Sequence, residues 1–231
     1  MVRTHSLAAD RVLLMRTSTA ERVAAILRAR ISEGHFQPGE RLTEEEITEA
    51  LGVSRNTLRE AFRLLTHERL LVHELNRGVF VRVPDVADLR DLYRVRKHVE
   101  CSVLREATVS PADLTRLTAA VEQGKQALRG QDWRGLGTAN IQFHEALVAL
   151  AGSERLAELM RAVLAELRLV FAVMANAERF HRPYLEHNEE ILVALQSGDG
   201  DRAAELLRSY LDDAERQLVE AYSANQAEQR G

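Results

Sequence analysis

The sequence predicts a mostly α-helical protein, with an N-terminal winged helix-turn-helix followed by a C-terminal, all-helical antiparallel bundle. Two observations predict this fold class. Residues 19–83 contain three short helical patterns and one candidate β-hairpin, whereas apolar residues beyond Pro84 recur only at helical spacing. The chain has 231 residues, 45% of them apolar, which is enough for a core in each of two domains. We therefore expect an N-terminal arm over 1–18, the winged module over 19–83 and the bundle over 84–231.

Two helices are predicted before Gly52. The first begins at Thr19 and ends at Gly34, because apolar residues between them recur three and four positions apart. The second begins at Thr43, which forms a capping box with Glu46 three residues later. Gly52 then supplies the tight turn between two helices of a helix-turn-helix.

The third helix carries a row of arginines. Ser54 is a preferred N-cap residue, and Arg55, Arg59 and Arg63 follow at four-residue spacing. Four residues advance a helix by one turn plus about 40°, so the three guanidinium groups fall on one narrow arc. A neighbouring arc is apolar and can seat the helix on a core: Leu58, Ala61, Phe62 and Leu65. A helix with one packing face and one cationic face fits a DNA major groove.

A β-hairpin completes the winged module. Two short apolar runs, 70–72 and 79–81, are rich in β-forming residues. Asn76, Arg77 and Gly78 lie between them, where a hairpin needs turn residues. Three helices followed by a hairpin make a winged helix-turn-helix.

Charge and composition narrow the classes of function. The net charge of the chain is −4, but residues 1–83 hold 13 Arg against 11 acidic residues, net +2, and the remainder has net −6. A more basic N-terminal part suits contact with a polyanion. No apolar run approaches the length of a membrane span, no signal peptide is apparent, and Cys101 is the single cysteine. We therefore expect a cytoplasmic protein without an internal disulfide or a membrane partner.

Beyond Pro84 the sequence predicts six helices and no strand. Ser110, Pro111 and Asp113 supply an N-cap, a proline at the first helical position and an acid in the first turn. The predicted helices cover 86–107, 111–129, 132–151, 153–177, 184–197 and 200–224.

A family resemblance rests on two motifs of the winged module, PGERLTEEEITEALGVSRNTLREAFRLL and NRGVFV. They resemble the DNA-binding domain of the GntR superfamily of bacterial transcription regulators. The helical remainder resembles the FCD effector domain of the FadR subgroup, and the similarity spans about residues 19–222. The supporting residues of the remainder are Leu92–Tyr93–Arg94–Val95–Arg96 with Glu100, Phe143–His144, Glu186–His187, and Ser197–Gly198–Asp199.

The resemblance implies a homodimer that binds a palindromic operator in double-stranded DNA. Arg41, Arg55 and Arg59 match arginines that contact DNA in the family, and Gly78 matches the wing-tip glycine that approaches the minor groove. Arg41 has an alternative role, an ion pair with the acidic residues of the second helix.

The residues themselves suit DNA contacts. Arginine can donate two hydrogen bonds to guanine O6 and N7, and each such pair favours guanine over other bases by roughly 1–3 kcal/mol. Ser54, Asn56 and Thr57 are short polar residues at a helix N-terminus and suit phosphates or base edges. Arg77 on the wing is a further candidate.

In FCD domains a divalent metal is typically held by an Asp, by a His four residues later and by two further His from later helices. Here Asn140 and His144 have the four-residue spacing, His187 matches a later position, and Tyr210 stands where the last His is expected. The resemblance therefore implies a zinc or nickel site at Asn140, His144 and His187. In this site the amide of Asn140 replaces the family's carboxylate, and the phenol of Tyr210, which is a poor metal ligand, replaces one imidazole. The alternative is a metal-free polar pocket in which His144 and His187 hydrogen-bond to an acidic ligand or to Tyr210.

Arg96 matches an arginine that points into the effector pocket of the family, where a guanidinium would clamp a carboxylate. Tyr210 belongs to the same expected effector site. The alternative for Arg96 is a salt bridge to Glu100, four residues on.

The function expected from these features is a ligand-responsive transcriptional regulator, a repressor released by a small organic acid. One alternative is a regulator whose bound metal is structural or sensed, and another is a helical-bundle metalloenzyme. The sequence contains no nucleophile motif, no Gly-rich phosphate loop and no HExxH pair, which argues against an enzyme.

Overall fold

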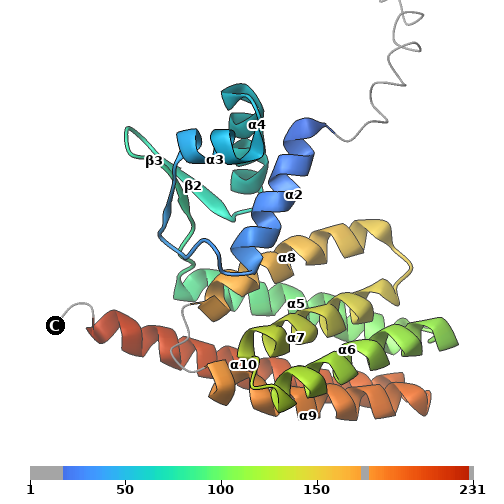
Figure 1. The fold of residues 1–231 in the computed structure, drawn as a ribbon. Coiled ribbons are helices and arrows are strands. Elements are labelled where there is room, and N and C mark those ends of the chain that lie inside the picture. Colours follow the sequence, from blue (N-terminus) through green and yellow to red (C-terminus); the bar gives the residue numbers. More distant parts are fainter. Residues whose placement is uncertain (1–17, 173–176, 229–231) are drawn as a thin grey trace, which may run out of the picture. The chain divides into compact units, whose positions relative to one another are not determined.

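The computed structural model describes residues 18–172 and 177–228, so all of the expected N-terminal arm except Ser18 lies outside this range. The chain divides into two compact units, 1–82 and 83–231. Helices dominate the described residues of both units, and a small sheet lies in the first (Figure 1). The mostly helical fold class predicted from the sequence is confirmed.

The first unit combines three helices with a three-stranded antiparallel sheet in the order β1-β3-β2 within the described residues. Strand β1 was not predicted, because its two residues, paired with Phe80 and Val79 of β3, are too few to show an alternating pattern. The elements are α2 (Thr19–Ser32), β1 (Arg41–Leu42), α3 (Glu44–Leu51), α4 (Arg55–His67), β2 (Leu71–Glu74) and β3 (Gly78–Val81).

The core of the first unit forms where α2 packs against α4. Helix α2 begins with a capping box between Ser18 and Glu21, which satisfies two backbone N–H groups of its first turn. The apolar face predicted for α4 is confirmed, since each of its members is at most 4% exposed: Leu58, Ala61, Phe62 and Leu65. With that face buried, the opposite face of α4 is left to solvent.

The helix-turn-helix follows the prediction at the start of both helices and at the turn between them, with one difference in capping. Ser54 caps α4, because its Oγ accepts a hydrogen bond from the backbone N–H of Thr57 at 3.1 Å. Gly52 adopts a left-handed conformation with φ of 62°, as the tight turn requires. The capping box predicted for Thr43 and Glu46 is wrong, because Thr43 makes no side-chain capping bond. Three glutamates in the first turn of α3 instead complement the positive end of the helix dipole.

The second unit is helical throughout its described residues. Helix α5 packs against α10, α6 against α7, and α9 against α6, α7 and α10. None of the described helices is both long and apolar enough to cross a membrane. The helices are α5 (Val86–Glu106), α6 (Pro111–Arg129), α7 (Trp133–Ala149), α8 (Glu154–Ala172), α9 (Ala177–Gln196) and α10 (Gly200–Glu228).

Helix α9 differs most from its prediction. It begins at Ala177 rather than at 184, so Pro183 lies inside the helix. A start at 184 would leave Pro183 outside the helix, where a proline interrupts no helical hydrogen bond. Within α9 it removes one backbone hydrogen bond. The end predicted for the preceding helix, at 177, cannot be compared, because 173–176 lie outside the described residues.

Candidate functional site

The predicted arginine row is present on the exposed face of α4. The side chains of Arg59 and Arg63 are 65% and 79% exposed. Arg59 Nε donates to Glu44 Oε1 at 3.0 Å, and this hydrogen bond and the carboxylate charge raise the pKa of Arg59. Arg63 pairs with Glu60 of its own helix at 3.1 Å. Arg55 makes no ion pair within the described part of the chain, so its guanidinium is available to an external anion.

The N-terminus of α4 adds short polar groups to this surface. Ser54 Oγ, which caps the helix, also lies 2.8 Å from Thr57 Oγ1. The two hydroxyl groups therefore hold one another beside the first turn, and Asn56, which precedes Thr57 in the sequence, is exposed. The free backbone N–H groups and the dipole of a helix N-terminus favour an anion such as a phosphate.

The wing places Arg41 beside its tip. Asn76 and Gly78 have positive φ angles of 61° and 112°, which form the turn between β2 and β3. A Cβ atom at Gly78 would lie 3.1 Å from Arg41 Nε, so the glycine allows the arginine side chain to lie against the backbone. Arg41 forms no ion pair with α3 among the residues described, and Glu44 of α3 pairs with Arg59 instead. In the turn between β2 and β3, Arg77 pairs with Glu74, and its guanidinium carbon lies 5.5 Å from the ring centroid of Phe80.

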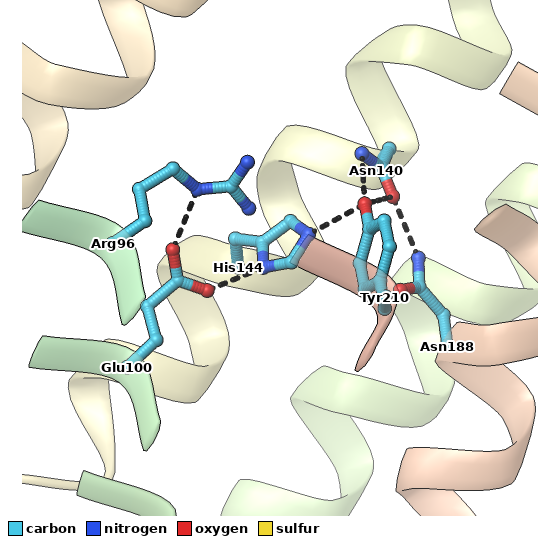
Figure 2. Close-up of polar contacts among 6 residues, drawn as sticks. All are labelled: Arg96, Glu100, Asn140, His144, Asn188 and Tyr210. Carbon is cyan, nitrogen blue, oxygen red and sulfur yellow. Dashed lines mark hydrogen bonds and ion pairs between the residues drawn. The ribbon is translucent and has the colours of Figure 1, made fainter. Parts of the chain in front are cut away.

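The second unit contains a cluster of polar side chains inside its apolar core. Each of the six residues is at most 7% exposed. We refer to them as the buried polar cluster (Figure 2): Arg96 and Glu100 from α5, Asn140 and His144 from α7, Asn188 from α9, and Tyr210 from α10. Four helices therefore meet at this cluster.

Hydrogen bonds run through the buried polar cluster from one side to the other (Figure 2). Asn188 Nδ2 donates to Asn140 Oδ1 at 2.8 Å, and Asn140 Nδ2 donates to the Tyr210 hydroxyl at 3.0 Å. The Tyr210 hydroxyl lies 2.9 Å from His144 Nε2. On the other side of the imidazole, His144 Nδ1 lies 2.6 Å from Glu100 Oε2.

The protonation states give this chain of hydrogen bonds a direction. Burial lowers the pKa of His144, so its ring is neutral near neutral pH. Burial raises the pKa of Glu100, but the charge of Arg96 and hydrogen bonds from both neighbours outweigh it and bring the pKa to about 2. The carboxylate accepts the proton of Nδ1–H, which leaves Nε2 as an acceptor for the Tyr210 hydroxyl. Burial raises the pKa of Tyr210 to about 12, so the phenol keeps the proton that it donates.

Both roles considered for Arg96 are compatible with its geometry. Its Nε donates to Glu100 Oε1 at 2.7 Å, which is the predicted salt bridge, and its guanidinium carbon lies 5.1 Å from the ring centroid of Tyr93. Its Nη2 is buried and makes no hydrogen bond with the described residues, and the same is true of Asn188 Oδ1. Buried polar atoms are nearly always paired, so these two atoms point to a missing partner.

Helix α9 presents Asn188 to the cluster rather than His187. The His187 side chain is 39% exposed, its Nδ1 lies 3.4 Å from Glu190 Oε2, and its ring stacks 5.9 Å from that of Tyr210. Successive helical residues are turned by about 100°, so His187 and Asn188 cannot both face inward. Asn188 was not predicted from the sequence, although Ile191, three residues on and fully buried, marks its face of the helix.

The donor atoms of the buried polar cluster do not fit a zinc or nickel ion. No group of three or more His, Cys, Asp or Glu within the described ranges is placed to hold a metal. Both nitrogens of His144 already face protein partners, and Asn140 Oδ1 accepts from Asn188. Zinc sites usually provide three or four imidazole, thiolate or carboxylate ligands.

Two protein-family models match the sequence. Residues 19–81 match the family described as bacterial regulatory proteins, gntR family, and residues 91–213 match the FCD domain. The first match covers the winged module with α4 and the wing, and the second covers the buried polar cluster.

Individual relatives agree with these matches. The Nta operon transcriptional regulator of Aminobacter aminovorans is 35% identical over 140 residues, which span 58% of this chain and 64%, less than two thirds, of that regulator. The galactonate operon transcriptional repressor of Escherichia coli K12 is 25% identical over 229 residues, 89% of this chain and 99% of that one. The crystal structure of a GntR transcriptional regulator from Rhodococcus sp. RHA1 is 51% identical with a TM-score of 0.84, and covers 89% of this chain and 100% of its own. The chain therefore belongs to the GntR family of bacterial regulatory proteins and carries an FCD domain, in a family of transcription regulators rather than enzymes.

Proposed function

We propose that the protein is a DNA-binding transcriptional repressor of the cytoplasm, which binds a palindromic operator as a homodimer and is released by a small carboxylate. The observation that carries the proposal is the exposed arginine face of α4, with Arg55 unpaired within the described residues and its opposite face buried. The family match and the repressor names of several relatives support the same function.

In this proposal α4 enters the major groove. Arg55 and Arg59 read guanine edges, and Ser54, Asn56 and Thr57 contact phosphates or bases at the start of the helix. Arg59 exchanges Glu44 for a base when the duplex arrives. Arg41 and Arg77 on the wing contact the DNA backbone and the minor groove. Gly78 has no side chain, which lets the wing approach the DNA closely.

The buried polar cluster is the proposed effector site. Arg96 Nη2 is a cationic donor without a partner among the described residues, and a carboxylate is the ligand that best satisfies a guanidinium. The neutral Tyr210 phenol adds a hydroxyl without a competing negative charge. Two relatives are repressors of the galactonate and gluconate operons, and both of these compounds are carboxylates. We therefore choose hydroxycarboxylates as the first probes.

Release of the operator on effector binding follows from the geometry of the dimer. Two half-sites have a fixed separation, so a dimer binds strongly only when its two α4 helices are correctly spaced. A carboxylate that binds more tightly to a dimer conformation with a different α4 spacing shifts the population toward that conformation. The coupling free energy of such a shift is typically 1–3 kcal/mol.

The test is selection of bound duplexes from a random library by the full chain. The proposal predicts enrichment of one inverted repeat, and a complex that contains two protein chains per duplex. Failure to enrich any sequence, at a salt concentration low enough for specific binding, would overturn it. An enriched sequence without an inverted repeat, bound by one chain, would overturn the dimer and the palindrome but not DNA binding.

A further inference from the structure

The family resemblance places one carboxylate and three imidazoles around a metal, at the positions of Asn140, His144, His187 and Tyr210. Two of these positions carry a weaker metal ligand, an amide at Asn140 and a phenol at Tyr210. At a third, the His187 side chain is 39% exposed, and its neighbour Asn188 lies in the buried polar cluster instead. The side chains that face one another in the cluster are therefore one imidazole, two amides and one phenol: His144, Asn140, Asn188 and Tyr210.

The hydroxyl group of Tyr210 occupies the space that a metal ion would need. A zinc or nickel ion bound to His144 would lie about 2 Å from Nε2, on the lone pair of that nitrogen. The Tyr210 oxygen lies 2.9 Å from the same nitrogen, and 3.0 Å and 3.2 Å from the two amide atoms of Asn140. An ion on the lone pair would therefore overlap the phenol oxygen, whereas a hydroxyl donating to Nε2 fits.

No carboxylate of the cluster is free to neutralise a divalent ion. Glu100 is the only acid among the six residues, and its two oxygens bind Arg96 at 2.7 Å and His144 at 2.6 Å. The charges of Arg96 and Glu100 cancel, and the other four side chains are neutral. A divalent charge added here would be buried without compensation, which is strongly unfavourable.

We propose that this chain has replaced the metal of its fold family with the Tyr210 hydroxyl and two amides, so that its effector domain is assembled and works without a metal ion. The hydrogen bonds from Asn188 through Asn140, Tyr210 and His144 to Glu100 join α9, α7, α10 and α5. They connect the same helices that a central ion would connect. The inference concerns the proposed effector site, but its test does not depend on DNA or effector binding, so it can fail while the regulatory function stands.

The experiment measures metal content. The full chain is purified without chelator or metal-affinity resin, incubated with excess zinc or nickel, freed of unbound ions by gel filtration and measured by elemental analysis. The proposal predicts a metal content far below about one ion per protomer. It also predicts that Tm does not change when either metal or a chelator is added. About one ion per protomer, lost in the His144→Gln variant, would overturn it.

A matched variant places the family's donor types, one carboxylate and three imidazoles, on the four side chains that face the cluster: Asn140→Asp, Asn188→His and Tyr210→His, with His144 kept. Imidazole is shorter than phenol, which makes room for an ion about 2 Å from each ring nitrogen. We expect this variant to take up about one zinc per protomer and to gain thermal stability with zinc. If it has the circular dichroism spectrum of the parent chain yet binds no metal, the proposed replacement is wrong.

Discussion

Arg59 on α4 is held by Glu44 on α3, with Nε 3.0 Å from Oε1 and 3.2 Å from Oε2 of the carboxylate. The pair joins the two helices of the helix-turn-helix on its exposed face. It also places a negative charge next to a guanidinium that we expect to meet DNA. Glu44 therefore competes with the duplex for Arg59.

The first prediction concerns this competition. Glu44→Gln should tighten binding to a mixed-sequence duplex several-fold at low salt, because it removes an anion from a surface that meets phosphates. Glu45→Gln is the matched control: it removes the same charge from the same helix, at an exposed residue that makes no ion pair in the described ranges. Fluorescence anisotropy measures both affinities. Equal gains would show that only net charge matters, and no gain for Glu44→Gln would contradict the competition.

The second prediction concerns the Tyr210 hydroxyl. Tyr210→Phe leaves His144 Nε2 and Asn140 Nδ2 buried without this partner, and should lower the free energy of unfolding by about 1–3 kcal/mol. Tyr222→Phe is the control, because its hydroxyl makes one longer bond, 3.3 Å, to the Val170 carbonyl. Denaturant unfolding compares the two variants. A loss for Tyr210→Phe no greater than that for Tyr222→Phe would contradict the network.

The third prediction concerns pH. The pKa of His144 is lowered by burial from its ordinary value of 6.5, so below this pH the unfolded chain binds a proton that the folded chain resists. Stability from this group is therefore complete above pH 6.5 and is lost as the pH falls toward the folded pKa. The low pKa of Glu100, about 2 against an ordinary 4.5, adds a loss only below about pH 4.5. Tm should fall between pH 6.5 and about 5.5, and less steeply for His144→Gln than for the exposed control His98→Gln. Equal slopes in the two variants would contradict a neutral buried His144.

The arginine face of α4 and the buried polar cluster differ in how far the sequence predicts them. A spacing of four residues in a helix places side chains on one face whatever the rest of the fold does, so the arginine row follows from local geometry. The orientation of α9 does not follow from local geometry, because His187 and Asn188 are neighbours and packing alone decides which of them is buried. Strand β1 depends entirely on its pairing with β3, a contact between residues far apart in the chain.

The fourth prediction concerns the effector. Arg96→Lys keeps the positive charge beside Glu100 but removes the unpaired Nη2. It should weaken binding of a hydroxycarboxylate such as gluconate or galactonate by roughly 10- to 100-fold, the loss of one charge-assisted hydrogen bond. Calorimetric titration measures the affinity, and Arg94→Lys on the exposed side of α5 is the control. If a carboxylate binds the parent chain and Arg96→Lys equally well, Arg96 does not hold it.

The most direct test of the central claim, that α4 reads DNA, is the affinity of Arg55→Ala for the duplex selected by the parent chain. At one fixed salt concentration, Arg55→Ala should bind about 5- to 150-fold more weakly, because one bidentate guanine contact contributes roughly 1–3 kcal/mol. Arg94→Ala removes an exposed arginine from the second unit and should bind like the parent chain. Unchanged affinity of Arg55→Ala, with the selected duplex still preferred over a scrambled one, would contradict the assignment of α4 as the reading helix.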